Sequence, residues 1–144
     1  TLYLDTSSLV KLYVAEAETD VVRQLVDDAA VVATSVVAYA ETRAALARLR
    51  RESELTASEF AAAKREFEKE WPTYLTLDVT DSLSRTAGEL AERYDLRGFD
   101  SVHLAAFADV ARRAGTRETR FSSFDDRLSQ AARKLMRTLE RTRE

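Results

Sequence analysis

The sequence predicts a helix-rich α/β fold of three layers, in which helices cover both faces of a short parallel sheet of four to five strands. Short apolar runs with strand character alternate with longer helical runs along the whole chain, and this alternation is typical of parallel sheets. The 144 residues contain no linker, internal repeat or low-complexity segment. Because this length suits one domain, we expect residues 1–144 to fold as a single unit.

The first predicted strand is followed directly by an aspartate. Leu2–Leu4 is apolar and too short for a helix, so it predicts a buried strand that ends before Asp5. Residues 5–8 offer several helix caps before apolar residues at helical spacing. A second helix is predicted after Thr19, with its apolar side chains facing inward (Val21, Val22, Leu25 and Val26). Residues 30–33 are short, apolar and rich in β-branched side chains, which predicts the second strand.

The middle of the chain predicts two long helices. Thr34 and Ser35 are suited to cap a helix over residues 36–51, whose basic end complements the helix dipole. Residues 56–59 match a capping box, so a second helix is expected to begin there and to end before Pro72.

The last third of the chain continues the alternation of strands and helices. The predicted elements are a strand at 74–79, a helix from Thr80 or Asp81, a helix over 102–114, a short strand within 116–123 and a final helix over 126–139. Asp100 is placed to open the helix over 102–114, and Gly115 is placed to close it.

The composition excludes several kinds of functional site. The chain has no Cys and one His, which excludes disulfides, thiolate metal sites and metal sites built from several histidines. Three Gly cannot supply a P-loop or a dinucleotide-binding fingerprint. The net charge of −3 gives no overall basic field for nucleic acid. No segment has the length of a transmembrane helix or the pattern of a signal peptide, so we expect a cytoplasmic protein with no membrane partner.

Four acidic residues stand at informative positions. Asp5 follows the first strand, Asp125 follows the last predicted strand, and Asp100 comes after a glycine-containing loop. Ligands of open parallel sheets bind beyond the carboxyl ends of the strands, where these three residues are expected. Glu41 comes four residues after Val37 and so shares the apolar face of its helix, where an unpaired carboxylate is costly.

Each of these acids also has a purely structural interpretation. Asp5 and Asp100 could cap helices. Asp125 could begin a turn with Asp126, and Glu41 could reach the surface. Four carboxylates at one edge of a sheet, however, would repel one another unless a cation lay between them. A carboxylate cluster without His or Cys suits Mg²⁺ or Mn²⁺, ions that usually serve phosphate chemistry.

Four segments resemble, in order, the acidic motifs of PIN-domain ribonucleases, most closely the VapC toxins of type II toxin–antitoxin modules. These segments are LYLDTSSLVKLY, AYAETRAAL, RGFDSVHLAAF and FSSFDDRLSQAA, and the resemblance covers nearly the entire chain. It implies a PIN-like nuclease domain over residues 1–144. It also implies an acidic quartet for catalysis and metal binding, made of Asp5, Glu41, Asp100 and Asp125.

The resemblance also implies a role for each site residue. Asp5 and Asp100 become the principal metal ligands, and Glu41 binds the metal or orients a water. Asp125 becomes the fourth acid, although Asp126 offers a competing carboxylate beside it. The residues expected to support these acids or to contact substrate are Thr6, Ser7, Arg97 and Ser123. The last strand departs from the usual apolar pattern, because Arg120 to Phe124 carries serines where the family often has Val-Thr.

The implied function is a Mg²⁺- or Mn²⁺-dependent endoribonuclease in which metal-activated water hydrolyses RNA. The implied partners are an RNA substrate, a small antitoxin protein that covers the site and a second copy of the chain in a homodimer. The helices around residues 36–71 are candidate dimer surfaces, and the basic C-terminal third together with Arg97 could line an RNA groove. Two alternatives remain at this point: a PIN-like nuclease of RNA processing outside a toxin module, and a non-catalytic binding domain.

Some residues favour packing over chemistry. His103 lies on the same apolar helix as Asp100, and one histidine cannot build a histidine-based metal site, so we interpret it as a packing residue. Phe60, Phe67 and Trp71 have the spacing of side chains that pack, and we do not expect them to stack on bases.

Overall fold

Four short parallel strands form the central sheet of the computed structural model, which describes residues 1–143. The strands are β1 (Leu2–Leu4), β2 (Val32–Ser35), β3 (Leu75–Leu77) and β4 (Arg120–Ser122), in the spatial order β3-β2-β1-β4. Leu2 of β1 is in register with Val32 on one side and Arg120 on the other, and all three pairings are parallel. The prediction of a helix-rich parallel α/β fold with four to five strands is confirmed.

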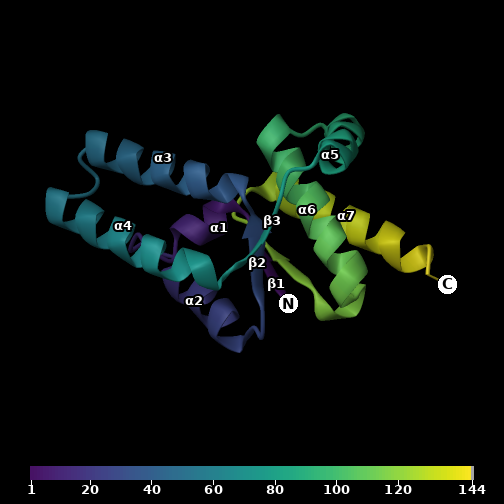
Figure 1. The fold of residues 1–144 in the computed structure, drawn as a ribbon, viewed down its shortest axis with the longest axis horizontal. Helices are drawn as coiled ribbons and strands as arrows, with labels where there is room; N and C mark the ends of the chain where they lie inside the picture. Colours follow the sequence, from purple (N-terminus) through teal and green to yellow (C-terminus); the bar gives the residue numbers. More distant parts are fainter. Residues whose placement is uncertain (144) are drawn as a thin grey trace.

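Within residues 1–143, seven α-helices surround the sheet in two layers (Figure 1). Their bounds are α1 (Thr6–Val10), α2 (Thr19–Asp28), α3 (Val37–Arg51), α4 (Ala57–Glu70), α5 (Asp81–Tyr94), α6 (Gly98–Ala114) and α7 (Asp126–Arg141). Two single turns of 3₁₀ helix, Trp71–Thr73 and Thr116–Glu118, precede β3 and β4. Helices α1 to α4 lie on one side of the sheet and α5 to α7 on the other, and α3 and α4 extend away from it as an arm (Figure 1).

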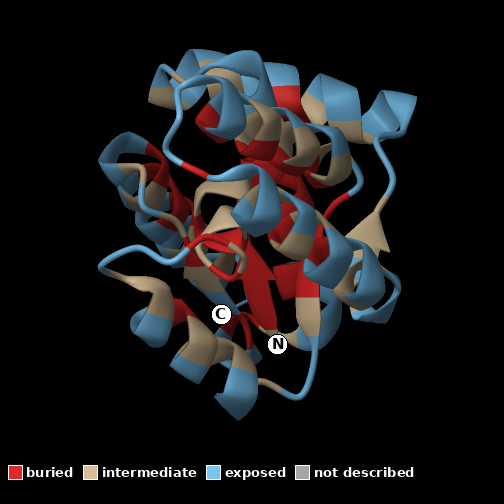
Figure 2. Ribbon diagram, turned by 90° about the vertical axis from the view of Figure 1, so that its left-hand side faces the viewer, coloured by how far each residue is buried: buried red, intermediate tan, exposed pale blue. Residues whose placement is uncertain are grey.

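The alternation of side chains along β1 divides the core between the two layers. Leu2 and Leu4 pack with α1, α2, α3 and α4, whereas Tyr3 packs with residues of α5, α6 and α7. Successive residues of a strand point to opposite faces, so one buried strand supports both cores. Figure 2 shows the result, with buried residues on the strands and on the helix surfaces that cover them.

Several helix boundaries follow the predicted caps. Asp5 caps α1 by accepting from the Ser8 amide at 3.0 Å. Thr56 and Glu59 form a complete capping box at the start of α4, and Thr80 caps α5. Gly115 ends α6 with a φ of 103°, a conformation that favours glycine.

Three sequence-based details were wrong. Strand β2 lies two residues later than expected, so Thr34 and Ser35 belong to the strand, because their backbones pair with β3. Ser35 Oγ still accepts from the Val37 amide at 3.3 Å at the start of α3. Helix α6 begins at Gly98, which places Asp100 inside its first turn. Val21 points outward and is 58% exposed, while Val22 is fully buried. No helix among the described residues is long and apolar enough to cross a membrane.

Candidate active site

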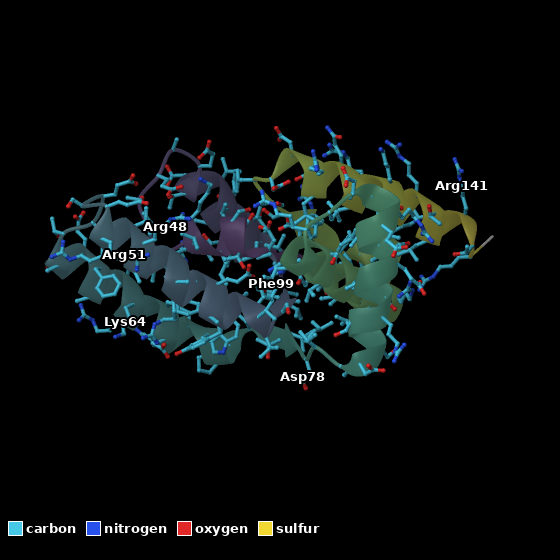
Figure 3. All side chains as sticks on the ribbon, turned by 90° about the horizontal axis from the view of Figure 1, so that it is seen from above. Arg48, Arg51, Lys64, Asp78, Phe99 and Arg141 are labelled. Carbon is cyan, nitrogen blue, oxygen red and sulfur yellow. The ribbon has the colours of Figure 1, made fainter. Side chains whose placement is uncertain are left out.

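The candidate site lies where the carboxyl ends of β1 and β4 meet the first turns of α1, α6 and α7. Asp5 follows β1 and caps α1, Asp125 follows β4 and caps α7, and Asp100 lies in the first turn of α6. Short parallel strands end together at one edge of the sheet, so segments far apart in the sequence meet there. Seen from this side, Phe99 at the start of α6 lies between the two halves of the molecule (Figure 3).

Asp5 is buried and held by hydroxyl groups. Only 4% of it is exposed. Its Oδ1 accepts from Ser7 Oγ at 2.7 Å as well as from the Ser8 amide, and its Oδ2 accepts from Ser123 Oγ at 2.5 Å. Burial raises the pKa of Asp5 above its ordinary value, although these hydrogen bonds oppose the rise. A carboxylate held in one orientation and short of solvation is well suited to bind a cation.

Glu41 lies at the end of a hydrogen-bonded chain from the core. Tyr3 Oη is 2.8 Å from His103 Nδ1, and His103 Nε2 is 2.9 Å from Glu41 Oε1. Thr6 Oγ1 also donates to Glu41 Oε1 at 2.7 Å. Burial alone would raise the pKa of Glu41, but the hydrogen bonds from His103 and Thr6 outweigh it and lower this pKa. Glu41 is therefore ionised at neutral pH.

The chain of contacts assigns the tautomer of His103. The ring is 2% exposed, so both nitrogens depend on protein partners. Burial, with the nearby charges of Asp5 and Glu41, raises the pKa of Tyr3 well above its ordinary value, so its hydroxyl keeps its proton. The Glu41 carboxylate can only accept, so Nε2 carries a proton and donates to it. The tautomer with its proton on Nε2 then accepts from the Tyr3 hydroxyl at Nδ1.

Asp100 interacts electrostatically with two of the other acids. Burial raises its pKa, and the negative charges of Asp125 and Asp5 raise it further, while the charge of Arg97 lowers it. Asp125 is half-buried, and its Oδ1 accepts from the Leu128 amide at 2.8 Å. Two acids from other segments of the chain thus act on Asp100 at this edge.

The four carboxylates do not converge on one point in this arrangement. Among residues 1–143, no three His, Asp or Glu side chains are close enough to form a metal-binding group. Glu41 is turned toward His103 and Thr6, and Asp125 is engaged at its helix cap. The donor set still fits a hard divalent cation, because it consists of carboxylate and hydroxyl oxygens. Burial first, and then the negative charges of Asp125 and Asp5, also raise the pKa of Asp100, which a bound cation would offset.

The predicted supporting residues differ in their contacts. Thr6 touches Glu41, and Ser7 and Ser123 both hold Asp5. Arg97 precedes α6 and acts on Asp100 through its charge. Asp126 is exposed in the first turn of α7, whereas Asp125 is half-buried and its charge acts on Asp100.

Sequence reasoning missed the way Tyr3 and His103 contribute to the site. His103 is a buried packing residue, as expected, but it also hydrogen-bonds Glu41. The spacing of three residues between Asp100 and His103 placed both on one face of a helix. Nothing in the sequence indicated that Tyr3, on the first strand, would lie under the same ring.

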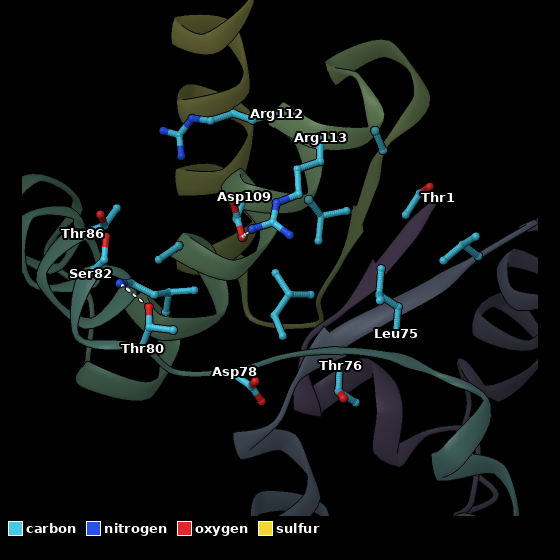
Figure 4. Close-up of a pocket in the computed structure, with 16 residues that line it drawn as sticks. Thr1, Leu75, Thr76, Asp78, Thr80, Ser82, Thr86, Asp109, Arg112 and Arg113 are labelled. Atoms are coloured by element: carbon cyan, nitrogen blue, oxygen red, sulfur yellow. Dashed lines mark hydrogen bonds and ion pairs between the residues drawn. The ribbon is translucent and has the colours of Figure 1, made fainter.

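A cavity of about 730 Å³ lies away from these acids, between β3, α5 and the C-terminal end of α6 (Figure 4). Leu75, Thr80, Arg112 and Arg113 line it, and Asp109 forms an ion pair with Arg113 at 3.1 Å. None of the four acids is among its lining residues. Two arginines of the basic C-terminal third therefore lie at the end of α6 that is remote from Asp100.

The fold and the site together define the class of protein. It is an α/β domain with a four-stranded parallel sheet and carboxylates beyond the carboxyl ends of the strands. The chain belongs to the PIN-domain family, whose model matches residues 2–134. It is 39% identical over 105 residues to Ribonuclease VapC45 of Mycobacterium tuberculosis (strain CDC 1551 / Oshkosh), which covers 73% of each chain. It is 33% identical over 134 residues to Ribonuclease VapC46 of Mycobacterium tuberculosis (strain ATCC 25618 / H37Rv), which covers 93% of this chain and 92% of that one.

A solved structure has the same fold. The crystal structure of Mycobacterium tuberculosis VapC20, described as a sarcin-ricin loop cleaving toxin, superposes with a TM-score of 0.65 at 24% identity. The match covers 91% of this chain and 95% of that chain. The resemblance to VapC-type PIN ribonucleases, predicted from four short motifs, is confirmed.

Proposed function

We propose that this chain is a Mg²⁺- or Mn²⁺-dependent endoribonuclease and the toxin of a toxin–antitoxin pair. The observation that carries this proposal is the placement of Asp5, Asp100 and Asp125 at one edge of the sheet, in a chain related to VapC ribonucleases. On this proposal the protein acts in the cytoplasm on RNA, residues 1–144 form one nuclease domain, and a small antitoxin covers the acids.

Asp5 and Asp100 would hold the divalent cation, with Asp125 as the fourth acid. Burial disfavours the charged form of Asp5 and of Asp100, which raises the pKa of each and makes a cation a favourable partner. When bound, such a cation lowers the pKa of a water and neutralises charge on phosphoryl oxygens.

Glu41 would bind the cation or orient the attacking water. Its lowered pKa keeps it ionised, so it can accept a hydrogen bond from a water. Thr6 and His103 fix the direction of its carboxylate from the side of the core. In-line attack of this water on the phosphorus would release the 3′ oxygen and leave 5′-phosphate and 3′-hydroxyl ends.

The test is cleavage of total cellular RNA by the purified chain, free of antitoxin, with Mn²⁺ or Mg²⁺ and then with a chelator. Asp100→Asn, purified identically, controls for contaminating nuclease. Asp20→Asn is the matched control, because Asp20 is an exposed acid in the first turn of α2. Discrete fragments that require both metal and Asp100, but not Asp20, support the proposal. Cleavage that survives Asp100→Asn contradicts it.

The absence of cleavage in every lane, together with a melting temperature that no divalent metal changes, would favour a binding domain. The antitoxin and the homodimer have separate tests. Size-exclusion chromatography with light scattering measures the mass of the free chain. Co-expression with the neighbouring gene product tests whether that product suppresses cleavage.

A further inference from the structure

Two aromatic side chains are exposed beside the acids, and neither is needed by the core. Phe99 is 60% exposed and Phe124 is 38% exposed. Every other Phe, Tyr and Trp in the described part of the chain is buried or partly buried. Phe99 directly precedes Asp100, and Phe124 directly precedes Asp125. The exposed aromatic rings of this protein therefore flank the candidate site.

The position of Phe124 is defined by contacts with the site. Its backbone amide donates to Ser7 Oγ at 2.9 Å, the same hydroxyl that donates to Asp5. The ammonium of Lys11 lies 4.6 Å from the centre of the Phe124 ring and also binds Glu16 and Glu18. The ring borders a groove of about 460 Å³ beside β4, so it has open space next to it.

Phe99 lies in the first turn of α6, on the side of the molecule where the strands end (Figure 3). It belongs to none of the hydrophobic clusters of the core. The guanidinium of Arg97, two residues earlier, is close enough to Asp100 to lower the pKa of that carboxyl. A cation, an apolar ring and a carboxylate thus follow one another over residues 97–100.

We propose that Phe99 and Phe124 bind unpaired bases of the substrate RNA on the two sides of the phosphate that is cleaved. Unstacked bases of single-stranded RNA bind by stacking on exposed aromatic rings, and nearby cations hold the backbone phosphates. Arg97 supplies such a cation. Bases inside a duplex are stacked on one another and cannot use these rings, so paired RNA does not engage them.

This inference rests on the proposed ribonuclease function, because it takes RNA as the ligand. A protein surface is the other kind of molecule that would cover exposed rings. RNA is favoured because each ring directly precedes an acid of the site and because the cation Arg97 stands two residues before Phe99. A partner bound to both rings would also cover the acids between them.

The experiment measures RNA binding and RNA cleavage separately. Binding of a labelled single-stranded RNA pool of mixed sequence, and of the same pool annealed to its complement, is measured with the chelator present. The variants are Phe99→Ala, Phe124→Ala and the aromatic replacements Phe99→Trp and Phe124→Trp. Leu75→Ala is the matched control, because Leu75 is 52% exposed and lines the remote cavity.

We expect each alanine variant to weaken binding of single-stranded RNA about tenfold, since one stacked base is lost. KM for cleavage rises by a similar factor, kcat and the melting temperature stay near those of the unmodified chain, and the tryptophan variants bind normally. Binding of duplex RNA does not change in any variant, and Leu75→Ala changes neither RNA binding nor KM.

Unchanged binding and KM in both alanine variants overturns the inference, as does an equal loss of single-stranded and duplex binding. If the alanine variants change only the oligomeric mass of the protein in solution, the inference is also overturned, because the rings would then belong to a protein interface. An unmodified chain that cleaves RNA while the alanine variants behave identically refutes only the inference. An unmodified chain that binds RNA through these rings without metal-dependent cleavage refutes only the proposed function.

Discussion

Tyr3→Phe tests whether the core orients the acidic site. The substitution removes one hydroxyl, which donates to His103 Nδ1 at 2.8 Å. The phenyl ring keeps its packing, because Tyr3 is stacked on Phe121 with ring centres 5.7 Å apart and is tilted against Phe107 at 6.1 Å. The change therefore removes a hydrogen bond and leaves the shape of the core intact.

The cost follows from the burial of the acceptor that is left behind. His103 is 2% exposed, so water cannot readily replace the lost donor. A buried polar atom left without its partner costs about 1–3 kcal/mol. For a domain of this size that lowers the melting temperature by about 3–9 °C. Urea unfolding of the metal-free protein measures the free-energy change directly.

Cleavage should fall as well. Without the Tyr3 hydroxyl, His103 can place its proton on Nδ1 and turn an unprotonated Nε2 toward Glu41, which repels the carboxylate. Outer contacts of this kind are typically worth about 10- to 100-fold in activity, and we expect a loss in that range. Initial rates of RNA cleavage with Mn²⁺ measure it.

Two comparisons make the result decisive. Tyr74→Phe removes a half-buried hydroxyl that donates to Glu70 at 3.0 Å near the start of β3, so it should lower stability without lowering cleavage. On a His103→Leu background, Tyr3→Phe should cost at least about 1 kcal/mol less, because no stranded acceptor remains. An equal cost on both backgrounds, or full cleavage by Tyr3→Phe, would refute the reasoning.

The remaining predictions concern the acids and their contacts. Asp5→Asn should lower cleavage at least about 100-fold, because several kcal/mol of transition-state stabilisation depend on the metal. The same variant should melt higher than the unmodified chain at pH 7 without metal. Burial raises the pKa of Asp5, so the contribution of Asp5 to stability is complete below its unfolded-state pKa and is lost as the pH rises through its folded-state pKa. The higher melting temperature of Asp5→Asn should therefore disappear near pH 4. Ser123→Ala removes the hydrogen bond to Asp5 Oδ2 and should lower cleavage about tenfold, whereas the exposed Ser82→Ala should not. Asp125→Asn should lower the cleavage rate and Asp126→Asn should leave it unchanged, because only Asp125 is half-buried beside Asp100.

Each of these predictions has its own result that would contradict it. A lower melting temperature of Asp5→Asn at pH 7 would mean that its hydrogen bonds outweigh the cost of its burial. Equal activity of the two serine variants would remove Ser123 from the site. Loss of cleavage in Asp126→Asn, with Asp125→Asn active, would exchange the roles of these two acids.

Much of the fold was predictable because local signals and tertiary packing agree. The capping box at Thr56 and Glu59 is a local hydrogen-bonding pattern, and the structure contains it at the predicted residues. The boundaries of β2 were less predictable. Thr34 and Ser35 have the chemistry of helix caps, but their backbones pair with β3, and sheet pairing is a long-range property. Val21 and Val22 differ completely in burial although both are valine, because only the helix orientation decides which one faces the core.

The sequence alone determined the class of the fold, the family and the chemical type of the candidate site. The alternation of strands and helices is a local pattern, and four short motifs in order carry the family resemblance. The residue counts exclude thiolate and multi-histidine sites. These properties depend on composition and spacing, which the chain carries whether or not it is folded.

Only the tertiary structure decided how the acids are supported. The hydrogen bonds from Tyr3 to His103 and from His103 to Glu41 join residues 100 and 62 positions apart in the sequence. The structure also distinguished Asp125 from its neighbour and placed exposed aromatic rings beside two of the acids. Such contacts arise because parallel strands end at one edge of the sheet and bring distant segments together, and no local pattern in the sequence encodes which side chains then meet.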